Sequence, residues 1–327
     1  MYELVDPAAQ ADLSAAHRRG VAVRIIRNRA FHGQRANDGA YTQLPAAGVA
    51  VHWAPAGQTF HQKSITIVGA HTMIGTGNLT ARYYPGTRDA WIDDCNPAQV
   101  HVIDATFTAD WDSPRHSGPQ VGAAGLVWSP GAGQQITAYL GTARRSVEFA
   151  GEELGDRHIV TALAGAAHRG VSCRIVMIVS ADRAAVFTAV TRAGCTVRTY
   201  PDVTKAVYIH EKLILIDGPS MLIGSQNATS TSLNSNREPP SPSPRRHWSK
   251  QPRQRSAPTT APPNPGPSDA MTQQPSMLTS TAGVEGCSGP VAIGAAMALL
   301  AGEKRCPPVI RAALGVVCVA ATADSGP

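Results

Sequence analysis

The sequence has few aromatic residues and no long apolar segment. Phe, Trp and Tyr make up 5% of its 327 residues, which leaves few side chains on which nucleic-acid bases could stack. Two apolar stretches occur near the carboxyl terminus, but 291–301 is too short to span a bilayer and Arg311 interrupts 309–321. A transmembrane helix is therefore not predicted, whereas a weak interfacial anchor and contact with a membrane surface stay open.

Cysteine spacing, net charge and the amino terminus bear on metal binding, on the kind of partner and on localisation. The six cysteines form no C-x-x-C pair and no metal-ligand spacing, so we expect free thiols and neither a metal site nor a cofactor. The net charge of +6 is modestly basic, which favours anionic partners such as phosphodiesters, lipid head groups or nucleic acid. No secretory signal is visible, so the sequence does not predict a compartment.

Residues 208–227, YIHEKLILIDGPSMLIGSQN, hold the densest group of chemically useful side chains. His210 and Lys212 are two positions apart, so they share a face of an extended strand. Ser225 and Asn227 end the following strand beside a glycine, where a backbone can approach a ligand closely. Together these side chains predict an anion site that contains a nucleophile or an acid.

A second copy of the pattern lies earlier in the chain. The pairs separated by 149 residues are His61 and His210, Lys63 and Lys212, Thr76 and Ser225, Asn78 and Asn227, and Asp89 and Glu238. Upstream, Glu3 and Glu153 are 150 residues apart. A repeat of this length indicates a duplicated half-domain rather than a solenoid unit.

The spacing of His210, Lys212 and Asp217, followed by Gly-Ser-x-Asn, resembles the HxKxxxxD motif and trailing GSxN of the phospholipase D superfamily. In that family two such motifs form one active site. The first copy departs from the pattern, because Val68 stands where the second copy has Asp217. The aspartate is seven residues after the histidine, an odd step that points it away from the His/Lys face. We therefore expect Asp217 to support the turn, and its loss in the first copy to weaken that half.

The resemblance covers residues 1–238 and implies an α/β fold of two pseudo-symmetric halves, each a mainly parallel sheet flanked by helices, in one monomeric chain. One histidine would attack phosphorus to give a phosphohistidine while the other protonates the leaving alcohol, without metal. The sequence does not decide which histidine attacks. The resemblance further implies that Lys63 and Lys212 hold phosphoryl oxygens, that Asn78, Asn227, Thr76 and Ser225 add neutral donors, and that Asp89 and Glu238 orient the histidines.

The substrate stays open at this point. Hydrolysis or transfer of a phospholipid head group is our first expectation, because duplicated single-chain members of the family are often lipid enzymes. The alternatives are an endonuclease, which the basic charge fits and the low aromatic content does not, and a catalytically impaired remnant that binds phosphate. Val68 and the irregular ends of the chain favour the remnant.

The expected domains are a first half at 1–112 that lacks its amino-terminal part, a linker at 113–125, a second half at 126–238 that lacks its carboxyl-terminal part, and a Pro/Ser/Arg-rich disordered tail at 239–327, unrelated to the family. Residues 27–42 are expected to form a loop over the site. The expected helices are 6–19, 96–110, 136–142, 158–168 and 181–193. The expected strands are 21–26, 49–53, 90–92, 147–150, 172–179, 196–200, 213–216 and 221–223.

Overall fold

The computed structural model describes residues 1–28, 37–112, 123–179, 181–200, 207–218 and 220–242. Most of the expected linker and the expected tail from residue 243 lie outside the described residues. The α-helices are α1 (Pro7–Arg18), α2 (Asp38–Ala46), α3 (Pro97–Asp112), α4 (Ala132–Gly141), α5 (Arg157–His168), α6 (Ala184–Arg192) and α7 (Ser230–Asn234). The strands are β1 (Arg24–Arg27), β2 (Ala50–Trp53), β3 (Ser64–Ile67), β4 (His71–Gly75), β5 (Thr87–Arg88), β6 (Trp91–Asp94), β7 (Leu126–Ser129), β8 (Ser146–Gly151), β9 (Ser172–Ile178), β10 (Thr196–Tyr200), β11 (Tyr208–Ile209), β12 (Lys212–Ile216), β13 (Ser220–Ile223) and β14 (Glu238–Pro242).

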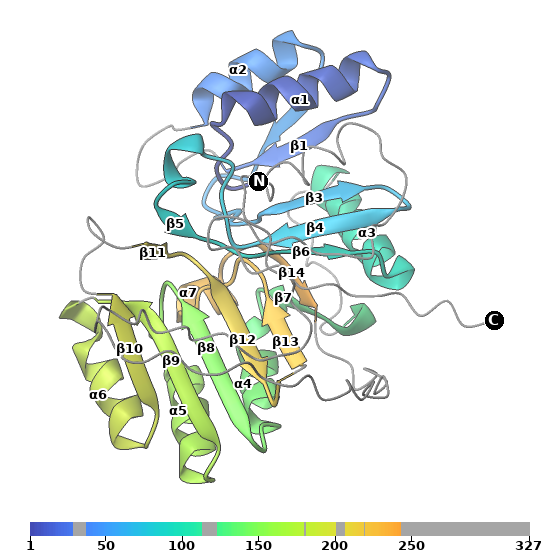
Figure 1. Ribbon diagram of the computed structural model, residues 1–327. Helices are drawn as coiled ribbons and strands as arrows, with labels where there is room; N and C mark the ends of the chain where they lie inside the picture. Colours follow the sequence, from blue (N-terminus) through green and yellow to red (C-terminus); the bar gives the residue numbers. More distant parts are fainter. Residues whose placement is uncertain (29–36, 113–122, 180, 201–206, 219, 243–327) are drawn as a thin grey trace, which may run out of the picture.

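The second half is built on one five-stranded sheet in the order β10-β9-β8-β12-β13. Its middle strand, β8, runs parallel to β9 and antiparallel to β12. Helices α5 and α6 lie along this sheet (Figure 1). Fully buried side chains such as Leu140 from α4, Leu163 from α5 and Ile175 from β9 form its main apolar cluster. Burial of these side chains is the principal stabilising contribution to this half.

The first half repeats the chain order but divides its strands between two sheets. β1 and β2 form a parallel pair, whereas β3, β4 and β6 form an antiparallel sheet. The helix that precedes β1 begins as its counterpart does. Asp6 accepts a hydrogen bond from the backbone N–H of Ala8 at the start of α1, and Asp156 accepts from those of His158 and Ile159 at the start of α5.

Short segments link the two halves across the middle of the molecule. β11, which leads into the second motif, pairs in parallel with β5 of the first half. In the symmetric position, Phe60, which precedes the first motif, forms a parallel bridge with Arg237 of the second half. Buried Arg237 also donates hydrogen bonds to Asp110 at the end of α3. The halves are therefore joined immediately beside both motifs.

The predicted α/β class and the pair of repeated halves are confirmed, with three differences in detail. The sheets are mixed rather than mainly parallel. Helix α2 occupies part of the expected loop at 27–42, because buried Ala40 and Leu44 pack in the apolar cluster that α1 also joins, despite Gly39 and Pro45 in its sequence. β14 extends to Pro242, inside the expected tail, and pairs with the unpredicted strand β7 through an irregular register.

The expectation of free thiols is wrong for Cys95, Cys173 and Cys195, which are all disulfide-bonded. Cys173 of β9 and Cys195, just before β10, form a disulfide with their Cα atoms 4.6 Å apart. The two residues are 22 positions apart in sequence, and they meet because β9 and β10 are neighbouring strands. Cysteine spacing alone cannot reveal such a pair.

Candidate active site

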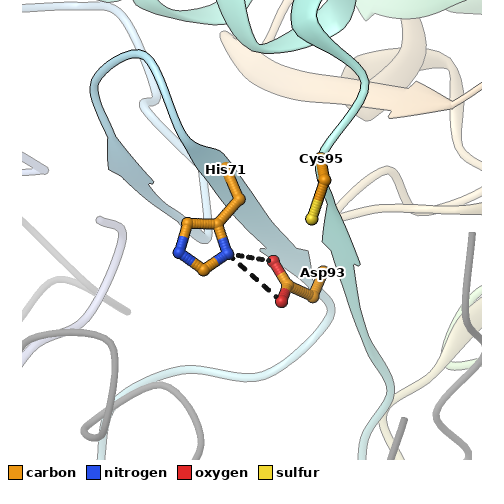
Figure 2. Close-up of side chains that lie close together, drawn as sticks. All are labelled: His71, Asp93 and Cys95. Carbon is orange, nitrogen blue, oxygen red and sulfur yellow. Dashed lines mark hydrogen bonds and ion pairs between the residues drawn. The ribbon is translucent and has the colours of Figure 1, made fainter. Parts of the chain in front are cut away.

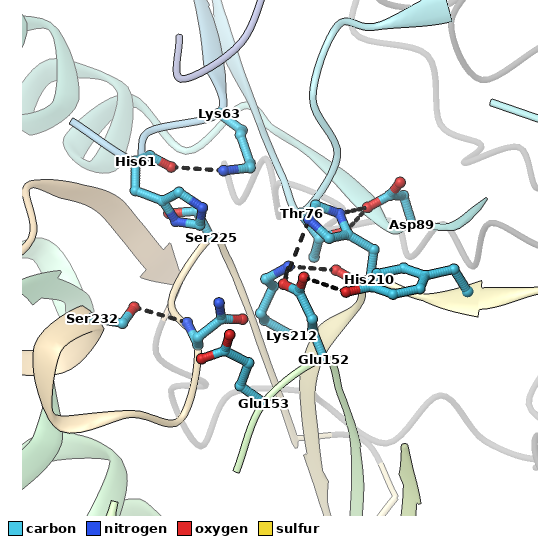
Figure 3. Close-up of polar contacts among 12 residues, drawn as sticks. His61, Lys63, Thr76, Asp89, Glu152, Glu153, His210, Lys212, Ser225 and Ser232 are labelled. Atoms are coloured by element: carbon cyan, nitrogen blue, oxygen red, sulfur yellow. Dashed lines mark hydrogen bonds and ion pairs between the residues drawn. The ribbon is translucent and has the colours of Figure 1, made fainter. Parts of the chain in front are cut away.

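Each motif histidine forms a hydrogen bond with a carboxylate from the opposite half. His61 Nδ1 lies 3.0 Å from Glu238 Oε2, and His210 Nδ1 lies 2.7 Å from Asp89 Oδ1. Figure 3 shows the first pair of motif residues, His61 and Lys63, facing the second pair across the site. A carboxylate that binds the Nδ1 hydrogen orients the ring and leaves Nε2 for chemistry. The predicted acids are therefore in contact with the histidines, in a crossed arrangement.

The crossing follows from the strand pairing between the halves. The backbone N–H of His210 donates to Arg88 O, one residue before Asp89, at 3.0 Å. In the symmetric position the backbone N–H of His61 donates to Arg237 O at 2.9 Å. These hydrogen bonds place each histidine beside the residue that follows the arginine. The carboxylate at Nδ1 of each motif histidine therefore comes from the other half.

The two hydroxyl residues of the motifs bind the acids. Thr76 Oγ1 donates to Asp89 Oδ1 at 2.7 Å, and Ser225 Oγ donates to Glu238 Oε2. Ser232 on α7 also donates to Glu238, through Oε1. The expectation that Thr76 and Ser225 donate to phosphate is therefore revised, because in this structure the carboxylates occupy their hydroxyl hydrogens. These hydroxyls orient the acids instead.

The two motif lysines are buried in matching positions but have different surroundings. Lys63 Nζ donates to His61 O at 2.9 Å, and Lys212 Nζ donates to His210 O at 2.7 Å. Lys212 also forms a 2.7 Å ion pair with Glu152 Oε2. At the repeated position the first half has Tyr2, whose ring centroid lies 4.7 Å from Lys63 Nζ.

These surroundings shift the pKa values of three groups in the site. Burial, followed by the nearby Lys63 charge, lowers the pKa of His61 to about 4. Burial and the Lys212 charge lower the pKa of Lys63 to about 7. Burial would raise the pKa of Glu152, but the Lys212 and His210 charges hold it well below its usual range. At neutral pH the first motif therefore presents a neutral imidazole, while Glu152 remains an anion.

The motif asparagines each have an unused polar atom. Asn78 Oδ1 and Asn227 Oδ1 are buried, and neither accepts a hydrogen bond among the described residues. Buried polar atoms are normally paired, so an unpaired one marks strain or a missing ligand. Their position directly after the small motif residues is consistent with the predicted contact with a substrate.

Asp217 lies at the far end of β12, where its contacts are those of a turn residue. Its carboxylate accepts from the backbone N–H groups of Arg144, Arg145 and Ser146, at the start of β8. Val68, at the matching position, is 65% exposed. The contacts of Asp217 agree with the structural role expected for it.

Sequence reasoning missed Glu152, Tyr2 and Tyr208. Glu152 Oε2 lies 3.6 Å from His210 Nε2, and its other oxygen accepts from the Tyr208 hydroxyl at 2.7 Å. The Tyr2 ring packs edge-on against His61 with a centroid distance of 4.5 Å. The repeat could not reveal Tyr2 and Glu152, because their residue types differ. Of the glutamates that did repeat, Glu153 and Glu3 lie 3.6 and 3.7 Å from Arg183 and Arg82.

A separate group, His71, Asp93 and Cys95, lies on and just after strands β4 and β6 (Figure 2). Its possible ligand atoms lie within 4.8 Å of one another, and His71 Nδ1 is 3.0 Å from Asp93 Oδ1. Cys95 is disulfide-bonded, whereas the thiolate is the form of cysteine that binds metals. We assign no metal to this group. Separately, none of the described helices is long and apolar enough to cross a membrane.

Comparison with solved structures supports the fold. The structure is similar to phosphatidylserine synthase from Haemophilus influenzae Rd KW20, with a TM-score of 0.51, 11% identity, and coverage of 73% of this chain and 74% of that chain. It is similar to polyphosphate kinase from Porphyromonas gingivalis, with a TM-score of 0.51 and 16% identity over 74% of this chain, and it spans 42% of that longer chain. The phospholipase D family member Nuc from Salmonella typhimurium is 23% identical over 36% of this chain and 78% of its own, with a TM-score of 0.33.

Comparison with protein families is more specific. No curated protein matches the chain. The family model described as "Cardiolipin synthase, PLD-like domain" matches residues 1–111 and 136–239, which include both motifs and both acids. The chain therefore belongs to the phospholipase D-like (PLD-like) family.

Proposed function

We propose that this chain cleaves or transfers phosphodiesters without metal, through a covalent phosphohistidine. The observation that carries the proposal is the crossed pairing of His61 with Glu238 and of His210 with Asp89, with both motif lysines beside them. Metal-independent phosphodiester cleavage needs a nucleophile, an acid for the leaving oxygen and cations for the non-bridging oxygens. This group of side chains can supply all three.

The two histidines would have different roles. The low pKa of His61 and the hydrogen bond of its Nδ1 to Glu238 leave Nε2 as a neutral nucleophile. His210 lies between two carboxylates, with Asp89 at Nδ1 and Glu152 near Nε2, so the complementary role of proton donor falls to this histidine. We therefore assign attack to His61 and proton donation to His210.

The reaction would proceed in two displacements. His61 Nε2 forms a bond to phosphorus while the bond to the leaving oxygen breaks, and that oxygen takes the Nε2 proton of His210. His210 then removes a proton from water or from an acceptor alcohol, whose oxygen attacks phosphorus and releases His61. Lys63, Lys212 and the amides of Asn78 and Asn227 would stabilise the phosphoryl oxygens in both steps.

The substrate that we propose is a phospholipid head-group phosphodiester. The description of the matched family as a cardiolipin synthase domain supports this choice, and so does the low aromatic content, which offers few platforms for bases. Single-stranded DNA and phosphatidylglycerol vesicles, offered separately to the purified chain, would distinguish the two substrate classes.

The proposal is tested with purified protein and a chromogenic phosphodiester in excess EDTA, followed by trapping of the covalent intermediate in acid-free gels. We expect turnover that survives the chelator and a phosphoryl adduct on His61. His61→Ala should remove both signals, whereas His101→Ala, a change at an exposed histidine on α3, should remove neither. Absence of turnover in a folded protein would contradict the proposal and favour a phosphate-binding remnant.

A further inference from the structure

Glu152 places a carboxylate where the proposed mechanism requires oxygens of the substrate. It directly follows β8, and its Oε2 lies 2.7 Å from Lys212 Nζ and 3.6 Å from His210 Nε2 (Figure 3). In the proposed mechanism Lys212 binds a phosphoryl oxygen, and His210 protonates the leaving oxygen. A phosphoryl group bound by these two side chains would therefore lie against the Glu152 carboxylate.

Several contacts hold Glu152 in this position. The Tyr208 hydroxyl donates to its Oε1 at 2.7 Å. Its backbone N–H donates to Glu211 O at 3.1 Å, and its carbonyl accepts from Arg183 Nη1 at 2.6 Å. Turning the side chain away would break both the Tyr208 hydrogen bond and the ion pair with Lys212, which is costly for a largely buried charge. We therefore expect the carboxylate to remain beside a bound ligand.

Glu152 is negatively charged at neutral pH and occupies part of the Lys212 ammonium. Burial alone would raise its pKa, but the Lys212 charge and then the His210 charge hold that pKa well below its usual range. A lysine ammonium has three N–H donors. Within the described part of the chain, Glu152 Oε2 and His210 O accept from two of them. One donor of Lys212 remains for a phosphoryl oxygen.

The matching position of the first half carries a neutral side chain. Tyr2 stands there, and burial raises the pKa of its phenol to about 12. Its ring centroid lies 4.7 Å from Lys63 Nζ. A phosphoryl group held by both motif lysines would thus meet a neutral ring beside Lys63 and a fixed negative charge beside Lys212.

A fixed negative charge discriminates between phosphate esters by their own charge. A phosphodiester is a monoanion, whereas a phosphomonoester has a second pKa of about 6 and is mostly a dianion at pH 7. Coulomb energy is proportional to the charge of the ligand, so a fixed carboxylate repels the monoester about twice as strongly as the diester. Hydrolysis of a diester produces such a monoester, and the same repulsion would favour its release.

We propose that Glu152 is a specificity-determining residue that selects monoanionic phosphodiesters against dianionic phosphomonoesters. The inference rests on the proposed function, because that function places the phosphoryl group at His210 and Lys212. It gives the difference between Glu152 and Tyr2 a use in the reaction: the second half-site limits how much negative charge the substrate and the product can carry.

Methyl phosphate and dimethyl phosphate form a matched pair of probes, because they differ by one methyl group and, at pH 7, by one charge. Phosphorus NMR titration of the whole purified chain measures both dissociation constants and does not require turnover. We expect the wild-type protein to bind dimethyl phosphate at least as tightly as methyl phosphate. Methyl phosphate binding that is more than about tenfold tighter would overturn the inference without any substitution.

Glu152→Gln removes the charge and keeps the shape of the side chain. It should tighten binding of dimethyl phosphate about threefold and that of methyl phosphate about tenfold, because a doubled interaction energy squares the factor. Glu152→Tyr, which copies Tyr2, should change the ratio of the two constants in the same direction, and it replaces the glutamine variant if that variant does not fold. The matched control is Glu153→Gln, since Glu153 lies 3.6 Å from Arg183. It should leave the ratio unchanged.

Three results would overturn the inference. Equal tightening for both anions in Glu152→Gln would mean that the carboxylate is simply displaced by any ligand. Weaker binding of both anions would mean that Glu152 only supports Lys212. The same change of ratio in Glu153→Gln would mean that no specific contact is involved. Failure of the proposed function is a different result, namely no turnover of a chromogenic diester by a chain that binds both anions.

Discussion

The two halves differ at the last residue of the HxKxxxxD pattern. In the second half Asp217 binds the backbone N–H groups at the start of β8. In the first half Val68 replaces the aspartate and is 65% exposed. The contacts of Asp217 are those of a residue that supports the start of a strand, in agreement with the role predicted for it.

A second difference concerns the lysines. Lys212 has the Glu152 carboxylate as a partner, whereas the matching Lys63 faces the ring of Tyr2. Two half-sites with the same motif therefore present different electrostatic environments. In the mechanism that we propose, this difference separates the roles of the two histidines.

The largest effect on kcat should come from substituting the two motif histidines, for which we propose different roles. His61→Ala should lower kcat by at least about 10³-fold with every phosphodiester, because no other group supplies the nucleophile. His210→Ala should cost about 10²–10⁴-fold with an alkyl ester, and much less with a p-nitrophenyl ester, whose leaving group needs no proton. Steady-state kinetics with both esters would check this. Equal losses across the two esters for both variants would mean that the halves are not differentiated.

Exchanging the turn residues should affect stability in one half only. Asp217→Val should lower the free energy of unfolding by about 1–3 kcal/mol, because three backbone N–H groups lose their acceptor. Asp217 also has a φ of 55°, a conformation that a β-branched residue adopts poorly. Val68→Asp should stay within about 0.5 kcal/mol. Urea unfolding of both variants measures the contrast, and similar losses would show that the aspartate position matters equally in both halves.

A glutamate at position 2, which matches Glu152 of the second half, should shift the pH dependence of kcat/KM. Lys63, with a pKa of about 7, should lose its charge and weaken anion binding as the pH rises above neutrality. Tyr2→Glu would place a carboxylate beside it and move the basic limb of kcat/KM upward by about one unit. Tyr2→Phe keeps the ring and serves as the control. An unmoved limb in Tyr2→Glu would exclude Lys63 as its origin.

The smallest effect is a pH dependence of stability. The unfolded lysine has a pKa of 10.5 and the folded one about 7, so between these values the unfolded state binds more protons. The contribution of Lys63 to stability is therefore complete above 10.5 and is lost as the pH falls to 7. Relative to wild type, Lys63→Met should show a smaller gain in Tm from pH 7 to 9. A larger gain in Tm in Lys63→Met than in wild type would mean that folding raises the pKa of Lys63 rather than lowering it.

Local pattern predicted most of the second half and the identity of the central site residues. The helix and strand expected at 158–168 and 196–200 agree closely with α5 and β10, because apolar periodicity and capping residues are local signals. The fixed offset between motifs likewise singled out both histidines, both lysines and both acids. These features needed no knowledge of which segments meet in space.

What the sequence could not provide depends on pairing between distant segments. The crossed His–carboxylate contacts arise from the pairing of β11 with β5 and of Phe60 with Arg237. Glu152 escaped notice because the repeat has Tyr2 at its position, and comparison of copies detects only what they share. Strand β14 was hidden by its three prolines, which lack the N–H that a regular ladder uses.

The crossed arrangement also constrains how such a protein can change over generations. Because Glu238 serves His61 and Asp89 serves His210, a substitution in either copy alters the environment of a ring in the other. These four positions are therefore coupled between the copies: Asp89 and Glu238 differ by only one methylene group, whereas Tyr2 and Glu152 differ in chemical type. Each of the two duplicated segments therefore constrains which residues the other can carry at these positions.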